Sequence, residues 1–450
     1  MTPAGIASRF VPLAGLLVLS LVQAQTSGTS RIEAAFQKFW SASSPIEAGK
    51  LADDIGRTGV TFDEAFTRLK AGRTYTAQTP GVVFLKNVTS DGIEHNFAVT
   101  VPANYDPSRR YQIRFQLHGG VGARNDNKPR NNGEIGALAG AEQFYVLPYS
   151  WDKAPWWGED QILNLNAIVD ALKRTYNIDE NRVLVAGVSD GATGAYYIAM
   201  RETTPFASFL PLNGFLMVLG SHDIDDGRIF PNNLRNKPLF VVNGGRDRLY
   251  PIRSVEPYTR HLMAKGVTID YHPQPEGEHN TRWWPEIKDP FEKFAADHPR
   301  DPHPAMLTWE TADASSHHLS HNRAHWLIID ELGAVPGEAK DLPEVNEVAR
   351  ESGNEQYRTL LFGNPKTSGR VDLVRESNEI RATTKGVKTF TLLISPDRFN
   401  LTKAIRVVVN GKEVFNGLVK PDLRTLLKWA ARDNDRTMLY AAELKIKLTR

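Results

Sequence analysis

Short apolar runs alternate with longer helical segments along the middle of the chain. The runs are residues 113–117, 144–148, 183–186, 209–212, 239–242 and 268–271. Apolar residues with helical spacing fill several intervening stretches, namely 162–176, 192–200 and 255–263. Strands that alternate with helices predict a largely parallel sheet covered on both faces, an α/β fold. An active site is expected at the carboxyl ends of such strands.

Changes of pattern divide the rest of the chain. Helical spacing predicts a helical lead-in over residues 25–80, and alternating apolar residues around a turn at 90–92 predict an opening hairpin. We expect the main α/β domain to span residues 81–332. A stretch rich in Glu, Pro and Gly, residues 333–365, is interpreted as a linker. Strand-like runs and an Asn-Gly turn then predict a small β-rich domain over residues 366–450.

The first residues resemble an export signal. A lone Arg9 precedes an apolar run over residues 10–22, and residues 22–24 have the small or apolar character that signal peptidase accepts. The run is shorter than the roughly 20 residues of a spanning helix, although an uncleaved anchor is the alternative. We expect residues 1–24 to be removed and the protein to be secreted or periplasmic, without membrane association afterwards.

Charge and cysteine content exclude several functions. The 54 Lys and Arg residues nearly balance 52 Asp and Glu residues, so the net charge of +2 gives no general reason to expect nucleic acid as a partner. The chain has no cysteine, which excludes disulfides, a thiol nucleophile and thiolate metal sites. The partner must therefore be inferred from a site.

The sharpest local motif is Gly187-Val188-Ser189-Asp190-Gly191. It follows a predicted strand directly and precedes a predicted helix, which is the context of a nucleophile elbow. The sharp turn exposes the serine, and Gly187 and Gly191 are required because side chains there would collide with the neighbouring strand and helix. The motif predicts Ser189 as a nucleophile.

A serine hydroxyl needs a histidine to take its proton and an acid to orient that histidine. Asp247 follows the run 239–242, and His279 lies on the loop after the run 268–271, which gives the expected order of serine, acid and histidine. Other candidates for the acid are Asp223, Asp225 and Asp226, which lie one strand too early in the chain. Other candidates for the base are His222 and His272, and His272 lies within a predicted strand. Asp247 and His279 could also be an ordinary turn residue and a surface histidine.

An oxyanion hole needs backbone N–H groups aimed at the developing charge. One is expected from Asp190, the residue after the nucleophile, and one from Gly120 in the loop His118-Gly119-Gly120 after the run 113–117. Glycines in that loop allow the backbone to approach a substrate oxygen closely. His118 and Gly119 are therefore candidate substrate contacts.

Two tryptophan pairs and a histidine cluster have weaker interpretations. Trp157 and Trp283, with their neighbours Trp156 and Trp284, could line the mouth of the site or simply pack loops. His317, His318, His321 and His325 form a dense cluster, which we interpret as a connecting loop. No metal and no cofactor is expected.

Taken in order, these four motifs around His118, Ser189, Asp247 and His279 resemble the α/β-hydrolase superfamily over about residues 80–295. The chain looks most like secreted bacterial esterases of the feruloyl esterase and polyhydroxybutyrate depolymerase kind. That resemblance implies hydrolysis of a small-molecule or polymer-linked carboxylic ester through an acyl-enzyme. The chain departs from a depolymerase in lacking cysteines and in its β-rich C-terminal region.

Two other functions fit the same sequence. A peptidase related to prolyl oligopeptidase would use the same triad but would need a site for a peptide amine. A catalytically silent hydrolase fold could bind polysaccharide or protein through the β-rich domain, although its triad would then be expected to be broken.

Overall fold

The structure is a computed structural model. It describes residues 30–89, 92–121, 136–221, 223–312, 321–335, 340, 342, 362 and 366–448. The expected signal, residues 1–24, lies outside the described residues, as does most of the expected linker. No helix in the described ranges is both long enough and apolar enough to cross a membrane.

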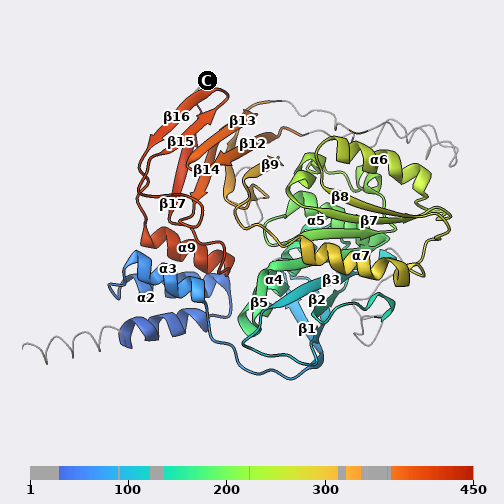
Figure 1. The fold of residues 1–450 in the computed structure, drawn as a ribbon, viewed down its shortest axis with the longest axis horizontal. Coiled ribbons are helices and arrows are strands. Elements are labelled where there is room, and N and C mark those ends of the chain that lie inside the picture. The colour runs from blue at the N-terminus through green and yellow to red at the C-terminus, as the bar shows by residue number, and fades with distance from the viewer. Residues whose placement is uncertain are drawn as a thin grey trace, which may run out of the picture.

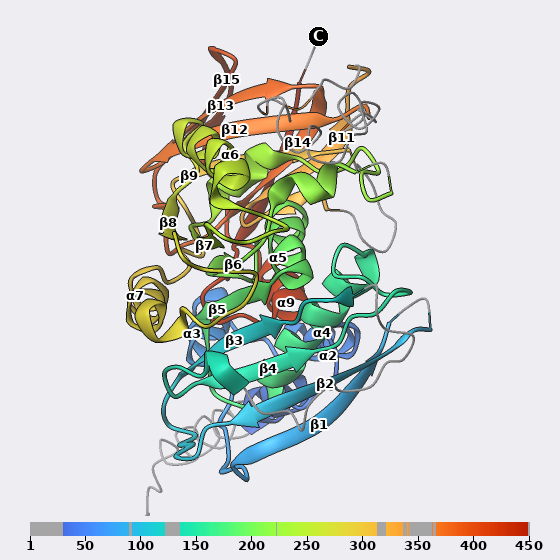
Figure 2. The same cartoon turned by 90° about the vertical axis from the view of Figure 1, so that its right-hand side faces the viewer.

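An eight-stranded sheet forms the centre of the main domain (Figures 1 and 2), with the order β1-β2-β4-β3-β5-β6-β7-β8. The strands are β1 (Gly81–Val88), β2 (Glu94–Val101), β3 (Tyr111–Leu117), β4 (Phe144–Pro148), β5 (Ile178–Val188), β6 (Ser208–Leu212), β7 (Leu239–Gly244) and β8 (Ile269–Gln274). The β1–β2 and β2–β4 pairs are antiparallel, and all other pairs are parallel.

Helices cover both faces of this sheet. The helical segments are η2 (Gly136–Leu138), α4 (Glu159–Thr175), α5 (Asp190–Arg201), η3 (Leu216–Gly220), η4 (Pro231–Asn236), α6 (Ile252–Ala264) and α7 (Trp284–Asp297). Apolar residues of α4, α5 and α6 share one core with the sheet, whereas α7 packs in a second core that contains Leu210 and Phe240. Burial on both faces explains the continuous apolar runs. The predicted α/β architecture is confirmed.

The C-terminal region is built from two further sheets, with the orders β10-β11-β14-β17 and β16-β15-β13-β12-β9. Their strands are β9 (Met306–Thr311), β10 (Arg323–Ala324), β11 (Leu327–Leu332), β12 (Gly369–Glu376), β13 (Glu379–Lys385), β14 (Val387–Ile394), β15 (Ile405–Val409), β16 (Lys412–Gly417) and β17 (Ala442–Lys447). One apolar cluster contains residues of both sheets. They therefore pack as a sandwich.

The expected domain boundary at residue 332 is wrong. β9 pairs with β12 and β11 pairs with β14, so strands β9 and β11 belong to the C-terminal sandwich and not to the main domain. The reason is that strand partners are chosen by long-range pairing, which local alternation does not reveal. Within the sandwich, Ser377 has a positive φ of 55° and lies in the turn of the β12–β13 hairpin.

The N-terminal helices pack against a helix that the sequence analysis did not predict. Residues 30–40, α2 (Pro45–Gly56) and α3 (Phe62–Ala71) share an apolar cluster with α9 (Leu423–Asp433). Figure 1 shows the lead-in helices beside α9 at the base of the sandwich. The lead-in is therefore joined to the C-terminal region.

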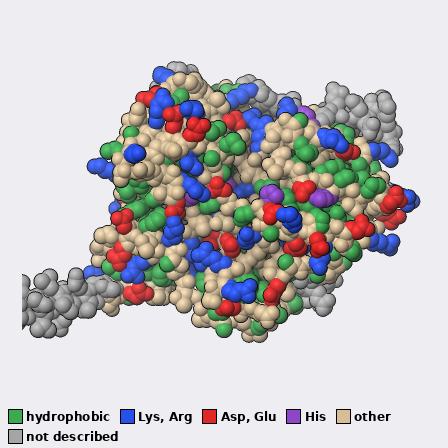
Figure 3. Space-filling view, viewed as in Figure 1, with side chains coloured by type: hydrophobic (Ala, Val, Ile, Leu, Met, Phe, Trp, Pro, Cys, Tyr) green, Lys and Arg blue, Asp and Glu red, His purple; other side chains and the backbone are tan. Residues whose placement is uncertain are grey.

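Buried ion pairs connect the sandwich to the main domain just after α9. Arg436 Nε lies 2.5 Å from Glu180 Oε1 of β5, and Asp435 Oδ2 lies 2.7 Å from Arg300 Nη2. Glu180 and Asp435 are both almost fully buried. The surface, by contrast, carries interspersed charges of both signs on the face that Figure 3 shows.

Candidate active site

Ser189 sits in a strained turn between β5 and α5. Its φ of 57° and ψ of −117° are rarely adopted by a residue with a side chain. The turn requires the flanking glycines, because a Cβ at Gly187 would overlap the carbonyl of Gly191 and a Cβ at Gly191 would overlap the carbonyl of Leu117. This geometry projects Ser189 from the carboxyl end of β5.

The structure brings Ser189, Asp247 and His279 together from three loops at the same sheet edge. His279 Nε2 lies 2.9 Å from Ser189 Oγ, and His279 Nδ1 lies 2.7 Å from Asp247 Oδ2. The side chain of Asp247 is fully buried, and that of His279 is 26% exposed. The three side chains form a continuous hydrogen-bonded chain that leads from the interior to the surface.

Asp247 is fixed as an ionised acceptor. Its Oδ1 accepts hydrogen bonds from the backbone N–H groups of Leu249 (2.8 Å) and Tyr250 (2.9 Å). Burial alone would raise the pKa of Asp247, but the hydrogen bonds from His279 and these two N–H groups lower it below its usual value. The carboxylate then accepts the Nδ1 proton of His279, which leaves Nε2 free to accept from the serine hydroxyl.

Tyr250 packs beside the histidine. Its ring meets the imidazole of His279 at an interplanar angle of 69°, with 5.6 Å between centroids. Burial and the carboxylates of Asp190 and Asp247 raise the pKa of Tyr250 to about 12, so the phenol stays neutral. Sequence reasoning missed this residue, although it lies three positions after the acid.

The glycine loop approaches the serine directly. A Cβ at Gly119 would lie 2.9 Å from Ser189 Cβ, and Gly120 has a φ of 69°. His118 holds the loop: its Nε2 accepts from the N–H of Ser150 (3.1 Å), and its Nδ1 donates to the carbonyl of Gly119 (3.0 Å). His118 thus holds the backbone of the loop in place, while Gly119 lies beside Ser189.

The side chain of Asp190 forms a hydrogen bond to the segment that follows the glycine loop. Asp190 is the first residue of α5, where helical N–H groups have no acceptor within the helix. Its Oδ2 accepts from the N–H of Val121 at 2.7 Å, directly after the glycine loop. This contact links the two predicted sides of the oxyanion hole and was not foreseen from the sequence.

Asn213, at the end of β6, connects to the histidine loop. Its Nδ2 donates to the carbonyl of Asn280, next to His279, at 2.7 Å. The backbone N–H of Asn213 donates to the carbonyl of Val242. The φ of Asn213 is 49°, a left-handed conformation that asparagine tolerates. The sequence feature that could have indicated this residue is the pair Asn213-Gly214, which directly follows the apolar run 209–212.

Of the two interpretations of Trp283, the structure supports packing and not a position at the mouth of the site. Trp283 is only 6% exposed and packs with α7 against the sheet. Trp156 is fully buried, and its Nε1 donates to the carbonyl of His118 at 2.8 Å. Trp157 is half-buried against the main core. Packing therefore explains Trp283 and Trp156.

The competing residues lie elsewhere. His272 pairs with Asp270 and stacks on Phe240, and Asp225 accepts from the N–H of Gly227. His222, His317 and His318 lie outside the described residues, while His321 bonds to Glu159 and His325 is buried. No group of three metal-ligating side chains occurs in the described part of the chain.

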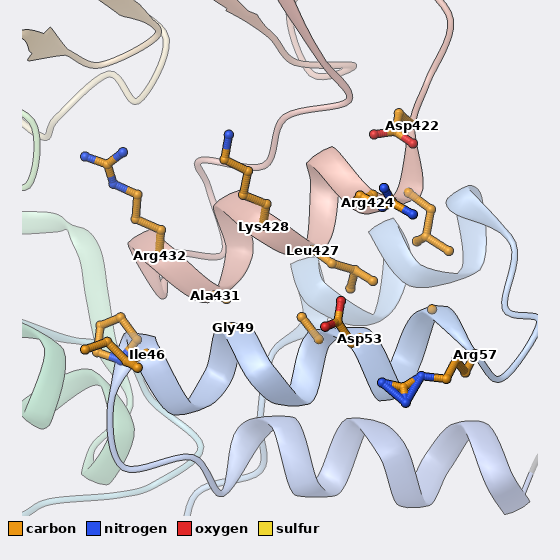
Figure 4. A pocket seen from close by; sticks show the side chains of 14 residues that line it. Ile46, Gly49, Asp53, Arg57, Asp422, Arg424, Leu427, Lys428, Ala431 and Arg432 are labelled. Atoms are coloured by element: carbon orange, nitrogen blue, oxygen red, sulfur yellow. The ribbon is translucent and has the colours of Figure 1, made fainter. Parts of the chain in front are cut away.

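A groove between α2 and α9 lies apart from the serine. It has a volume of about 860 Å³ and runs between α2 and α9 (Figure 4). Figure 4 shows Arg424, Lys428 and Arg432 projecting from α9 above the α2 side. None of its lining residues comes from the loops around Ser189. The groove is therefore not part of the site around Ser189.

A sheet of this order, with a serine turn after β5, an acid after β7 and a histidine after β8, is the α/β-hydrolase arrangement. The chain has the α/β-hydrolase fold, as its motifs predicted.

Comparisons with known proteins give limited similarity. No family model matches the chain. A bifunctional acetylxylan esterase/xylanase from Neocallimastix patriciarum is 25% identical over 206 residues, which cover 43% of this chain and 29% of that protein. The chain therefore corresponds to less than a third of that relative's length.

Solved structures align with about half of the chain. A thermostable esterase has 19% identity and a TM-score of 0.40, covering 49% of this chain and 63% of its own. A ferulic acid esterase has 14% identity and a TM-score of 0.38, covering 49% and 99%. Dipeptidyl peptidase 4 of Porphyromonas gingivalis has 15% identity and a TM-score of 0.39, covering 49% and 36%.

Proposed function

We propose that the protein is a serine hydrolase that cleaves carboxylic esters through an acyl-enzyme. One observation carries the proposal: a half-buried Ser189 in a strained turn, whose Oγ lies 2.9 Å from His279 Nε2, while His279 Nδ1 lies 2.7 Å from Oδ2 of the buried Asp247. This is the geometry of an activated serine with an oriented base.

In the proposed reaction, Ser189 Oγ attacks the ester carbonyl while His279 takes its proton. Asp247 keeps the imidazole oriented and stabilises the imidazolium that forms. The backbone N–H groups of Asp190 and Gly120 hold the oxyanion. His279 then gives its proton to the departing alcohol, and a water activated by His279 releases the acid and restores Ser189.

The substrate class rests on weaker support. The glycine loop and serine motif resemble those of secreted esterases, and the relative from Neocallimastix patriciarum is named a bifunctional acetylxylan esterase/xylanase. We therefore propose an acyl group carried by a small alcohol or a polymer such as a plant polysaccharide. The export signal predicted over residues 1–24 would direct the protein to the periplasm or out of the cell.

The catalytically silent alternative is disfavoured by the contacts of the triad. A binding module would not need the hydrogen bonds that link Ser189, His279 and Asp247. The sandwich also offers no aromatic platform among its described exposed residues: the large apolar side chains there are Met306, Val374, Val414 and Leu418. Aromatic faces are what sugars usually stack on.

Hydrolysis of a small panel tests the proposal. The panel contains p-nitrophenyl acetate, longer acyl esters, methyl ferulate and a prolyl peptide amide, each assayed with wild type and Ser189→Ala. We expect ester turnover that the Ser189→Ala variant loses, while Ser108→Ala, a change in the loop before β3, leaves it intact. Turnover retained by Ser189→Ala would overturn the assignment, and cleavage of the peptide alone would identify a peptidase.

Covalent labelling provides a second test that does not depend on the right ester. A fluorophosphonate should modify the folded wild type at Ser189, which peptide mass spectrometry identifies. Asp247→Asn should slow labelling because the histidine loses its orienting carboxylate. Labelling at another serine, or none in a folded protein, would contradict the proposed nucleophile.

A further inference from the structure

The outer edge of β1 is unpaired in the described structure. β1 is the first strand of the eight-stranded sheet and pairs with β2 alone. Figure 2 shows it along the lower margin of the sheet. An unpaired edge strand presents N–H and C=O groups that can accept another strand.

The ladder defines which groups face outward. At the end of the hairpin, the N–H of Thr89 donates to the carbonyl of Ile93 at 2.9 Å, so these opposite residues form a hydrogen-bonded pair. Hydrogen-bonded pairs alternate along an antiparallel ladder. The odd-numbered residues of β1 therefore bond to β2, and the even-numbered residues direct their backbone groups away from the sheet.

This edge is also apolar. Val82, Phe84, Leu85 and Val88 are 39%, 55%, 41% and 65% exposed. The one charged residue of the strand, Lys86, lies 2.9 Å from Glu94 on β2, so its charge is compensated within the chain. An edge strand with four exposed large apolar side chains invites association.

Another edge in the same chain is capped. The outer edge of β9 is covered by η4, where side-chain amides replace a partner strand: Asn233 Oδ1 accepts from the N–H of Glu310 (2.8 Å), and Asn236 Oδ1 accepts from the N–H of Thr308 (3.1 Å). The Nδ2 groups of both asparagines donate back to carbonyls of β9. No further strand can pair there.

The other described edges carry different protection. β10 has only two residues; β8 contains Asp270 and Pro273, β16 contains Lys412 and Glu413, and β17 contains Glu443, Lys445 and Lys447. Short length, charge and proline all discourage pairing. Among the six edges of the described sheets, β1 is exceptional in combining full length with an apolar surface.

We propose that β1 pairs antiparallel with the β1 of a second copy of this chain, about a two-fold axis at Leu85. In this register Val82 faces Val88 of the other copy and Phe84 faces Lys86. These are even-numbered residues, so the outward backbone groups of the two copies meet, and Phe84 offers its ring face to the Lys86 ammonium. The pairing is isologous, because the same strand edge of each copy forms the contact. Neither copy then has a free β1 edge for a third copy, so the assembly closes as a dimer.

Cysteine crosslinking tests the register, since the chain has no native cysteine. Residues facing each other on the axis form a close pair whose Cα separation suits a disulfide. Leu85→Cys should give a covalent dimer under mild oxidation. Val82→Cys and Val88→Cys should each remain largely uncrosslinked alone but form a disulfide when mixed. Absence of the Leu85→Cys dimer, or equal crosslinking by all three, would overturn the proposal.

Charge substitution tests the interface without a covalent bond. Sedimentation velocity over a hundredfold range of concentration should show a dimer for wild type. Val82→Lys with Val88→Lys places like charges opposite each other and should raise the dimer dissociation constant at least 100-fold. Val82→Lys with Val88→Glu places opposite charges together and should restore the dimer. A monomeric wild type, or a dimer indifferent to all these changes, would overturn the proposal.

Discussion

The carboxylate of Asp190 accepts a hydrogen bond from the backbone N–H of Val121 at 2.7 Å. One residue thereby connects the helix that begins at the serine turn with the loop that carries Gly119 and Gly120. If these two segments supply the oxyanion donors, this hydrogen bond sets the distance between them. Precise placement matters because donors must meet the oxyanion and not the ground-state carbonyl.

Replacing Asp190 by alanine should lower kcat about 10- to 100-fold with little change in KM, because the backbone donor at residue 190 stays while the opposite side loosens. Asp190→Asn keeps an oxygen that accepts from Val121 and should retain most of the activity. Steady-state kinetics with p-nitrophenyl acetate measures both. Equal loss in the two variants would show that the charge, not the hydrogen bond, matters.

Replacing Asn213 separates a hydrogen bond from backbone strain. Both Asn213→Ala and Asn213→Gly lose the donor to Asn280 and should lower kcat by about 10-fold, since a displaced histidine costs productive geometry. Only the alanine variant also places a Cβ at a φ of 49°, and this strain should lower its free energy of unfolding by about 1 kcal/mol. Kinetics and urea unfolding measure the two effects. Unchanged kcat in both variants would remove Asn213 from the positioning network.

The stability of the protein should fall as the pH drops from about 6.5 to about 4 because of His303. Burial outweighs the hydrogen bond to the Thr437 carbonyl and lowers the pKa of His303 from 6.5 to about 4. The unfolded chain then binds a proton first, so the contribution is fully present above pH 6.5. It amounts to about 3 kcal/mol at most.

The variant His303→Gln isolates this component, because glutamine can still donate to the Thr437 carbonyl but does not titrate. Urea unfolding at several pH values should give a shallower decline between pH 6.5 and 4 for the variant than for wild type. Identical slopes would mean that other groups, among them the buried His325, account for the pH dependence.

Removing Arg436 should destabilise the protein by about 3–5 kcal/mol, because Glu180 would remain buried and unpaired. Arg436→Met preserves much of the side-chain volume. Adding Glu180→Gln removes the unpaired charge and should recover a large part of the loss. Urea unfolding of the single and double variants measures this, and a double variant as unstable as the single one would contradict the explanation.

The strands, the serine turn and the order of the triad were predictable because each depends on local sequence. Gly187 and Gly191 are dictated by backbone overlap within a few residues of Ser189. Asp247 and His279 follow apolar runs that end at one sheet edge. A parallel sheet brings those ends together whatever the loops contain.

The supporting contacts could not be predicted in this way. The hydrogen bonds from Val121 to Asp190 and from Asn213 to Asn280 join residues that are 69 and 67 positions apart. The burial of Trp283 against the sheet likewise depends on how α7 packs. Local periodicity contains no information about which distant side chain completes a hydrogen bond.

The sequence by itself determined the α/β-hydrolase sheet, the serine turn and the chain order of the candidate triad, because short-range sterics and apolar periodicity specify them. Only the tertiary structure decided that β9 and β11 join the C-terminal sandwich, that the lead-in packs on α9, and that the outer edge of β1 has no partner strand among the described residues. Those outcomes follow from long-range pairing, where a strand's partner is selected by the packing of the whole chain.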